Sequence, residues 1–245
     1  SNGFFGMIQD ATVKNFTISG QATTACVYNG GNIGVVGMAK AVNAYCYITN
    51  VHSKVNFTMG DNYTKGATGG VVGNAVGKSS SPWNYVIIER CTYSGKMNLG
   101  NQYCDCTGGI VGYIAYTSVV KTEKCLFAGS ITTEYKDNIQ VGGILGYNRG
   151  ANYFMKNCLS VGTITVVNTT FAGQLAGRYL QTSSNGASRV DTVMKNNYYR
   201  SANSLPAVSN TSGMSYSDIE MSDFDTFGDD NAKSVTNAQL KSGEI

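Results

Sequence analysis

A short apolar pair enclosed by glycines recurs along the chain and divides it into segments of similar length. Each copy ends on a glycine, and these closing glycines are Gly6, Gly37, Gly73, Gly112, Gly146 and Gly177. Successive closing glycines are 31 to 39 residues apart, and a period of this size is typical of stacked-repeat architectures. We therefore expect a repeat fold in which every segment forms one coil.

A second hydrophobic pattern follows each glycine box. We take as reference one position per coil, which is occupied by Phe16, Val51, Cys91, Cys125 and Cys158. Six residues further on the side chains are apolar: Ala22, Phe57, Met97, Ile131 and Ile164. Their sequence neighbours on both sides are polar: Gln21 and Thr23, Asn56 and Thr58, Lys96 and Asn98, Ser130 and Thr132, Thr163 and Thr165. This alternation predicts a strand with one buried face.

Strands this short cannot bury a core alone, so equivalent residues of successive coils are expected to stack, with each strand paired in parallel to its copy one coil away. We expect the glycines to mark sharp corners by adopting positive φ. Asparagine is the next-best residue for that conformation, and it precedes the inward column at Asn15, Asn50, Asn157 and Asn196. The thiols Cys91, Cys125 and Cys158 should then form one interior column.

The predicted fold is all-β: a single-stranded parallel β-helix, or β-solenoid, of about five to six coils. Right-handed winding is expected from the general preference of parallel crossovers. Residues 1–200 are assigned to the repeats. Residues 201–245 are assigned to an irregular acidic segment that caps the last coil and ends in a truncated helix.

Composition agrees with many turns and little helix, since the 245 residues include 30 glycines and 2 prolines. The net charge is only +3, and the basic residues are scattered, so we expect no nucleic-acid partner. No apolar stretch is long enough to cross a bilayer as a helix. Because a repeat box begins at residue 3, the solenoid is expected to start before Ser1, within a longer protein.

Together, the glycine box and the Asn-Cys box, exemplified by Asn157-Cys158, resemble the GLUG-repeat family of bacterial surface proteins over about residues 3–200. Coil two, which has Val51 and no glycine before its next strand, and the last box, Gln174-Leu175-Ala176, depart from the pattern. The resemblance implies a parallel β-solenoid. It also implies an extracellular, adhesin-like or display role on a bacterial surface.

The chain has seven cysteines, an odd number. Reduced, buried thiols are favoured, because in-register side chains run parallel and fit the disulfide torsion poorly. Cys104 and Cys106 flank one residue and leave open a metal half-site or a bridge to Cys26 or Cys46.

Catalytic signals are sparse. The single histidine, His52, follows an inward residue and should face solvent, and no nucleophile elbow accompanies it. Glu89 and Glu123 occupy the same position of consecutive coils, as a paired-acid glycosidase or a lyase would require. Their column continues with Lys14, Thr49, Lys156 and Lys195, which favours a solvated, charge-compensated surface.

One acidic cluster is a candidate for calcium: Asp218, Asp223, Asp225, Asp229 and Asp230. Its spacing does not match the twelve-residue calcium loop, so a solvated linker is favoured. We assign no metal and no cofactor.

Aromatic residues outside the boxes are the candidate binding residues, because exposed rings stack on sugars or anchor a protein partner. They are Trp83, Tyr85, Tyr113, Tyr116, Tyr147 and Tyr153. An ice-binding reading of the column Thr23, Thr58, Asn98, Thr132 and Thr165 is disfavoured, because the flanking column is irregular and carries Lys96.

The sequence therefore favours a monomeric, non-catalytic surface module that binds a host or matrix glycan or protein through loops on one face. A carbohydrate-active solenoid enzyme, lyase-like or glycosidase-like, is the alternative.

Overall fold

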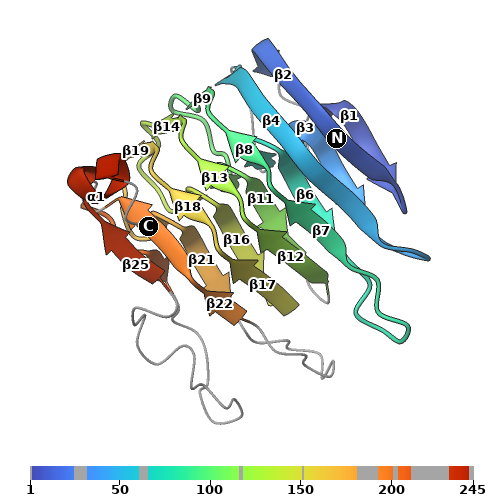
Figure 1. Cartoon of the computed structure of the whole chain (residues 1–245). Coiled ribbons are helices and arrows are strands. Elements are labelled where there is room, and N and C mark those ends of the chain that lie inside the picture. The colour runs from blue at the N-terminus through green and yellow to red at the C-terminus, as the bar shows by residue number, and fades with distance from the viewer. Residues whose placement is uncertain are drawn as a thin grey trace.

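The computed structural model describes residues 2–24, 32–60, 66–115, 118–150, 152–180, 193–200, 204–210 and 232–242. These form a parallel β-solenoid of about five turns. Figure 1 shows the strands stepping along one axis from the N-terminus to the C-terminus, in two sheets that lie one behind the other. The predicted fold class is confirmed, and the handedness stays a prediction.

The 11-stranded sheet, here called sheet A, contains the glycine boxes. Its strands are β1 (Asn2–Gln9), β3 (Ile33–Lys40), β5 (Ala67–Gly69), β6 (Val72–Val76), β10 (Cys106–Gly108), β11 (Val111–Ile114), β15 (Gln140–Gly142), β16 (Leu145–Arg149), β20 (Ala172–Gly173), β21 (Ala176–Leu180) and β24 (Val208–Asn210). From the third coil onward, each coil contributes two strands to sheet A, one before and one after its glycine box.

The 14-stranded sheet, here called sheet B, contains the Asn-Cys blocks. Its strands are β2 (Thr12–Thr24), β4 (Cys46–Met59), β7 (Val86–Glu89), β8 (Thr92–Tyr93), β9 (Lys96–Asn98), β12 (Val119–Glu123), β13 (Leu126–Phe127), β14 (Ser130–Thr133), β17 (Asn152–Lys156), β18 (Leu159–Ser160), β19 (Thr163–Val166), β22 (Val193–Lys195), β23 (Asn197–Arg200) and β25 (Ala232–Val235). One short helix, α1 (Asn237–Ser242), follows.

The strand register confirms the predicted columns. Ala22 pairs with Phe57, Phe57 with Met97, Met97 with Ile131, and Ile131 with Ile164. The flanking column from Thr23 to Thr165 pairs in the same steps. Equivalent residues of successive coils therefore share one interior.

The left-handed backbone turn before the reference position is confirmed at all four predicted asparagines. Asn15, Asn50, Asn157 and Asn196 have φ between 53° and 61°. Arg90 and Lys124 adopt the same conformation, at φ 54° and 53°, in the coils that have no asparagine there. Because these residues lack asparagine's local advantage in this region, stacking against neighbouring coils imposes the turn.

The expectation that the box glycines adopt positive φ is wrong. Among the described glycines, positive φ occurs only at Gly20, Gly100 and Gly150, none of which belongs to a box. The box glycines are required instead because other atoms lie too close for a side chain. A Cβ on Gly109 would lie 2.1 Å from the carbonyl oxygen of Gly143 and 2.3 Å from Cδ2 of Phe127.

The space left by the opening glycines is filled by rings from sheet B. The rings of Tyr93 and Phe127 stack with centroids 6.3 Å apart and planes 4° apart. The Tyr93 hydroxyl donates to the carbonyl oxygen of Val55 at 3.0 Å. The glycine boxes thus let the two sheets approach each other around a column of aromatic side chains.

The C-terminal segment differs in part from the expected irregular cap. β24 pairs in parallel with β21, and β25 pairs in parallel with β23, so the described part of 201–245 continues both sheets. The predicted terminal helix is present as α1.

Substituting Gly109 by alanine should destabilise the protein by about 3 kcal/mol, because the added methyl group overpacks a site bounded by backbone and a ring. Urea unfolding followed by far-UV circular dichroism measures the change. Gly100→Asn is the matched control: Gly100 has φ +54° with nothing within 4 Å of an added Cβ, and asparagine tolerates this conformation. Equal unfolding midpoints for the two variants would contradict the close-approach role.

Candidate functional site

A groove runs across the outer face of sheet A, where the sheet bends at the glycine boxes. Strands before the boxes and strands after them form its two sides. The closing glycines allow the bend, since a Cβ on Gly112 would lie 2.7 Å from the backbone oxygen of Thr68, and one on Gly146 would lie 2.7 Å from the backbone nitrogen of Thr107. The groove has a volume of about 1020 Å³.

The groove collects side chains from four successive coils and from the end of β3. Its lining residues are Asn32, Met38, Gly66, Ala67, Asn74, Tyr103, Asp105, Cys106, Tyr113, Asn138, Gln140, Tyr147, Arg149, Phe171 and Arg178.

One wall is a column of outward side chains, here called the groove ladder: Met38, Asn74, Tyr113, Tyr147 and Arg178. Successive members are register partners in sheet A. Parallel strands lie about 4.8 Å apart, so the ladder presents one side chain per coil along the solenoid axis. All five members are half-buried.

The C-terminal half of the groove ladder is aromatic and cationic. The rings of Tyr113 and Tyr147 have centroids 5.8 Å apart and are tilted by 51°. Cζ of Arg178 lies 5.3 Å from the centroid of Tyr147 and 4.8 Å from that of Phe171. The guanidinium is thereby held against two rings by cation–π attraction.

The other wall contains a hydrogen-bonded carboxylate. The hydroxyl of Tyr103 donates to Oδ1 of Asp105 at 3.2 Å. With the Gln140 amide oriented so that its nitrogen faces this carboxylate, the orientation that satisfies both amide atoms, the nitrogen donates to the same oxygen at 3.2 Å. Burial, followed by the charge of Asp105, raises the pKa of Tyr103 to about 12. Tyr103 therefore remains a neutral phenol that donates to a charged carboxylate.

Next to Asp105, the thiol of Cys106 is buried in the groove floor. Burial is the largest cause that raises its pKa well above the ordinary value, and the charges of Asp105 and Cys104 add to it. The thiol is therefore protonated at neutral pH and is no nucleophile.

Two polar atoms of the groove ladder are buried without a hydrogen-bond partner: Oδ1 of Asn74 and Nε of Arg178. A buried unsatisfied group costs about 1–3 kcal/mol. A polar ligand that supplies the missing partner would recover part of this free energy.

The structure brings Tyr113 and Tyr147, two of the predicted binding residues, side by side. They lie on β11 and β16 rather than on loops. The prediction that Tyr153 lies on the surface is wrong. Its side chain is buried on the interior face of β17, where its ring packs against that of Tyr179 with centroids 6.0 Å apart. Tyr116 lies outside the described residues.

Tyr85 and Trp83 belong to a different surface, beside sheet B. The ring of Tyr85 contacts that of Tyr45 at a centroid distance of 5.5 Å, and Nζ of Lys121 lies 4.5 Å from the centroid of Tyr85. Trp83 is half-buried. Tyr45, Tyr85 and Lys121 form an aromatic patch with Trp83 two residues before Tyr85 in the chain, and none of these residues lines the groove.

The column that contains the two glutamates, here called the charge ladder, is in register as predicted. It consists of Lys14, Thr49, Glu89, Glu123, Lys156 and Lys195. Nζ of Lys124 and Nη2 of Arg90 lie 3.3 Å and 3.6 Å from Oε1 of Glu89. Neither glutamate lines the groove, so the pair does not flank a ligand bound there, as two catalytic acids flank the scissile bond.

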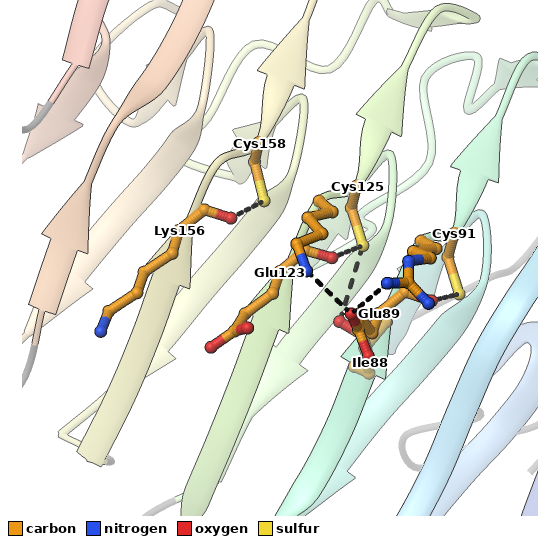
Figure 2. A network of polar contacts seen from close by, with 9 residues as sticks. Ile88, Glu89, Cys91, Glu123, Cys125, Lys156 and Cys158 are labelled. Atoms are coloured by element: carbon orange, nitrogen blue, oxygen red, sulfur yellow. Dashed lines mark hydrogen bonds and ion pairs between the residues drawn. The ribbon is translucent and has the colours of Figure 1, made fainter.

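The thiols of Cys91, Cys125 and Cys158 form the predicted interior column (Figure 2). Each Sγ points to the carbonyl oxygen two residues earlier, that of Glu89, Glu123 or Lys156, at 3.3–3.4 Å. Burial raises the pKa of Cys125 well above its usual value. Cys46, Cys104 and Cys106 are also buried free thiols, whereas Cys26 lies outside the described residues.

The remaining candidates do not converge on a site. The Nε2 atom of His52 lies 3.0 Å from Oδ1 of Asn50 on the outer face. The five candidate calcium aspartates lie outside the described residues. Within the described ranges, no three His, Cys, Asp or Glu side chains come together as metal ligands, and no helix has the length and apolarity to cross a membrane.

The sequence reasoning missed Arg178, Phe171, Tyr103, Asp105 and Gln140 as groove residues. A usable signal was present for Arg178, because every member of the groove ladder directly follows a closing glycine. The other four come from segments of unequal length before the boxes, where the repeat predicts no common position.

Comparison of the chain with protein-family models, curated proteins and solved structures yields no match in any of the three. The resemblance to the GLUG-repeat family therefore stays a prediction.

We predict that a thiol reagent such as DTNB will react slowly with the six described cysteines of the native protein, because all six are buried. In denaturant without reductant, the chain should release about seven equivalents, one for each cysteine. Five or fewer would demonstrate a disulfide.

The double substitution Glu89→Gln with Glu123→Gln should change the free energy of unfolding by less than about 1 kcal/mol, because exposed ion pairs contribute little. It should also leave any release of reducing ends from polysaccharides unchanged. Urea unfolding and an assay for reducing ends on a polysaccharide panel measure the two effects. A polysaccharide that the wild type degrades and the double variant does not would instead identify this pair as catalytic.

Proposed function

We propose that this chain is a non-catalytic binding module of a bacterial cell-surface protein and that the groove on sheet A binds a carbohydrate chain. The observation that carries the proposal is the groove ladder, in which Tyr113 and Tyr147 occupy the same outward position of consecutive coils.

A polymeric ligand suits this geometry because the groove is itself periodic. The ladder advances by about 4.8 Å per coil, which is close to the length of one pyranose unit in an extended glycan. Tyrosine faces stack on sugar rings, while Asn74 and Gln140 supply donors and acceptors for hydroxyl groups. Each coil would thus bind about one sugar unit.

The extracellular location rests on the resemblance to GLUG-repeat surface proteins. On this proposal the module acts as a monomer within a longer surface protein and attaches the cell to a host or matrix glycan. A protein ligand on the patch around Trp83 and Tyr85 is the competing mode of adhesion.

A carbohydrate-active enzyme is the second candidate, favoured by the location of Asp105 in the groove. Asp105 is the one carboxylate among the described lining residues. Its Oδ1 accepts hydrogen bonds from Tyr103 and Gln140. A hydrolase that uses two acids needs a second carboxylate across the ligand, so binding without turnover is the better account.

Replacing Tyr147 by alanine should lower the affinity for the bound glycan about tenfold, because one stacked ring contributes about 1–1.5 kcal/mol. Glycan-array screening of the wild type identifies the ligand, and isothermal titration calorimetry compares the variants. Phe154→Ala is the control, since Phe154 is a half-buried outward ring on the other sheet.

Trp83→Ala distinguishes the two surfaces. It should leave glycan affinity unchanged if the groove binds the ligand. Normal binding by Tyr147→Ala together with weak binding by Trp83→Ala would transfer the function to the patch beside sheet B.

A further inference from the structure

The distribution of charge in the groove bears on the chemical class of the ligand, and this inference rests on the proposed glycan-binding function. Three charged residues line the groove: Asp105, Arg149 and Arg178. Arg178 is half-buried and Arg149 is exposed, and the charges of both act to lower the pKa of the Cys106 thiol, against the larger effects that raise it.

Asp105 does not neutralise Arg178. No carboxylate of the described residues lies within ion-pair distance of Arg178. The ion pairs among the described residues join Glu89 to Arg90 and to Lys124, beside sheet B. Asp105 instead accepts from Tyr103 and Gln140 on the other wall. Arg178 therefore forms no direct ion pair with any carboxylate of the described residues.

Arg178 is also held in place and partly desolvated. The rings of Tyr147 and Phe171 lie within 5.3 Å of its Cζ, and its Nε is buried with no hydrogen-bond partner. A half-buried guanidinium without an anion has lost part of its hydration without gaining a counter-charge. Its fork of donors matches an anionic group with two oxygens, such as a carboxylate.

We propose that the groove binds an acidic glycan, with an anionic group of one sugar unit on Arg178 and the ring of the preceding unit on Tyr147. The glycan lies along the solenoid axis, since the groove ladder does. Uronate carboxylates and sulfate esters share the chemistry that Arg178 recognises.

The test measures the binding of polysaccharides to the intact chain by calorimetry. Polygalacturonate and hyaluronan represent carboxylates, dextran sulfate represents sulfates, and dextran and mannan are neutral. We expect one acidic class to bind, with an affinity that decreases as salt is added. We expect the neutral polymers to bind at least tenfold more weakly.

Arg178→Gln should reduce the affinity for the acidic polymer about tenfold or more. Arg178→Lys should restore part of it, because the charge is kept and the two-pronged geometry is lost. Lys121→Gln removes an equal charge beside the rings of Tyr85 and Phe154 on sheet B and should have no effect. Thermal unfolding of each variant verifies that it is folded.

The outcomes separate this inference from the proposed function. Tyr147-dependent binding of a neutral polymer, unaffected by Arg178→Gln, would overturn the acidic-glycan inference and leave the glycan-binding function in place. Binding of an acidic polymer that is equally strong in Arg178→Gln would also overturn it. Failure of every polymer to bind would overturn both.

Discussion

The close approach of backbones at the glycine boxes is the constraint on which the rest of the structure depends. At each box the chain of one coil lies directly against the next, and at Gly70, Gly109 and Gly143 the opening glycine also leaves no room for a Cβ beside the ring of Tyr93 or Phe127. The interior can then accept Tyr93 and Phe127 in a stack. On the outer face of sheet A, the closing glycines let the strands before the boxes approach the strands after them, and the groove lies between the two sets. One local requirement therefore shapes both the core and the candidate site.

The corner in sheet B is subject to a different constraint, which is the limited room for side chains inside a sharp turn. A residue with positive φ turns the chain between β7 and β8, and again in the following coils. The thiol that follows points to a carbonyl oxygen two residues back. A small side chain with a weak donor fits the narrow interior, and its contact adds to the backbone hydrogen bonds that the carbonyls of Glu123 and Lys156 already accept from the preceding coil. This accounts for cysteine at a position where Phe16 and Val51 stand in the first two coils.

The two outer faces differ in how their charged side chains are paired. On sheet B, Glu89 of the charge ladder pairs with Arg90 and Lys124, although Nε of Arg200 on β23 is buried without a hydrogen-bond partner. On sheet A, the groove ladder keeps Arg178 without a carboxylate and leaves two buried polar atoms without partners. A surface whose groups are mutually satisfied gains little from a ligand, whereas the groove can still gain. For this reason we place the binding function there.

The sequence alone determined the repeat, the strand columns and the left-handed turns, because each of these depends on residue type at a fixed spacing along one coil. Cys91, Cys125 and Cys158, for example, could be assigned to one interior column from their spacing. It did not determine which of the aromatic residues meet. Tyr113 and Tyr147 become neighbours through parallel register, whereas Tyr153, of the same residue type, turns inward. Arg178 packs against Tyr147 and Phe171 and forms no ion pair with Asp105. Both facts depend on how the strands before the glycine boxes pack against the strands after them. The angle between these two sets of strands is set by packing between coils and between sheets. It cannot be read from the spacing of residues along one coil.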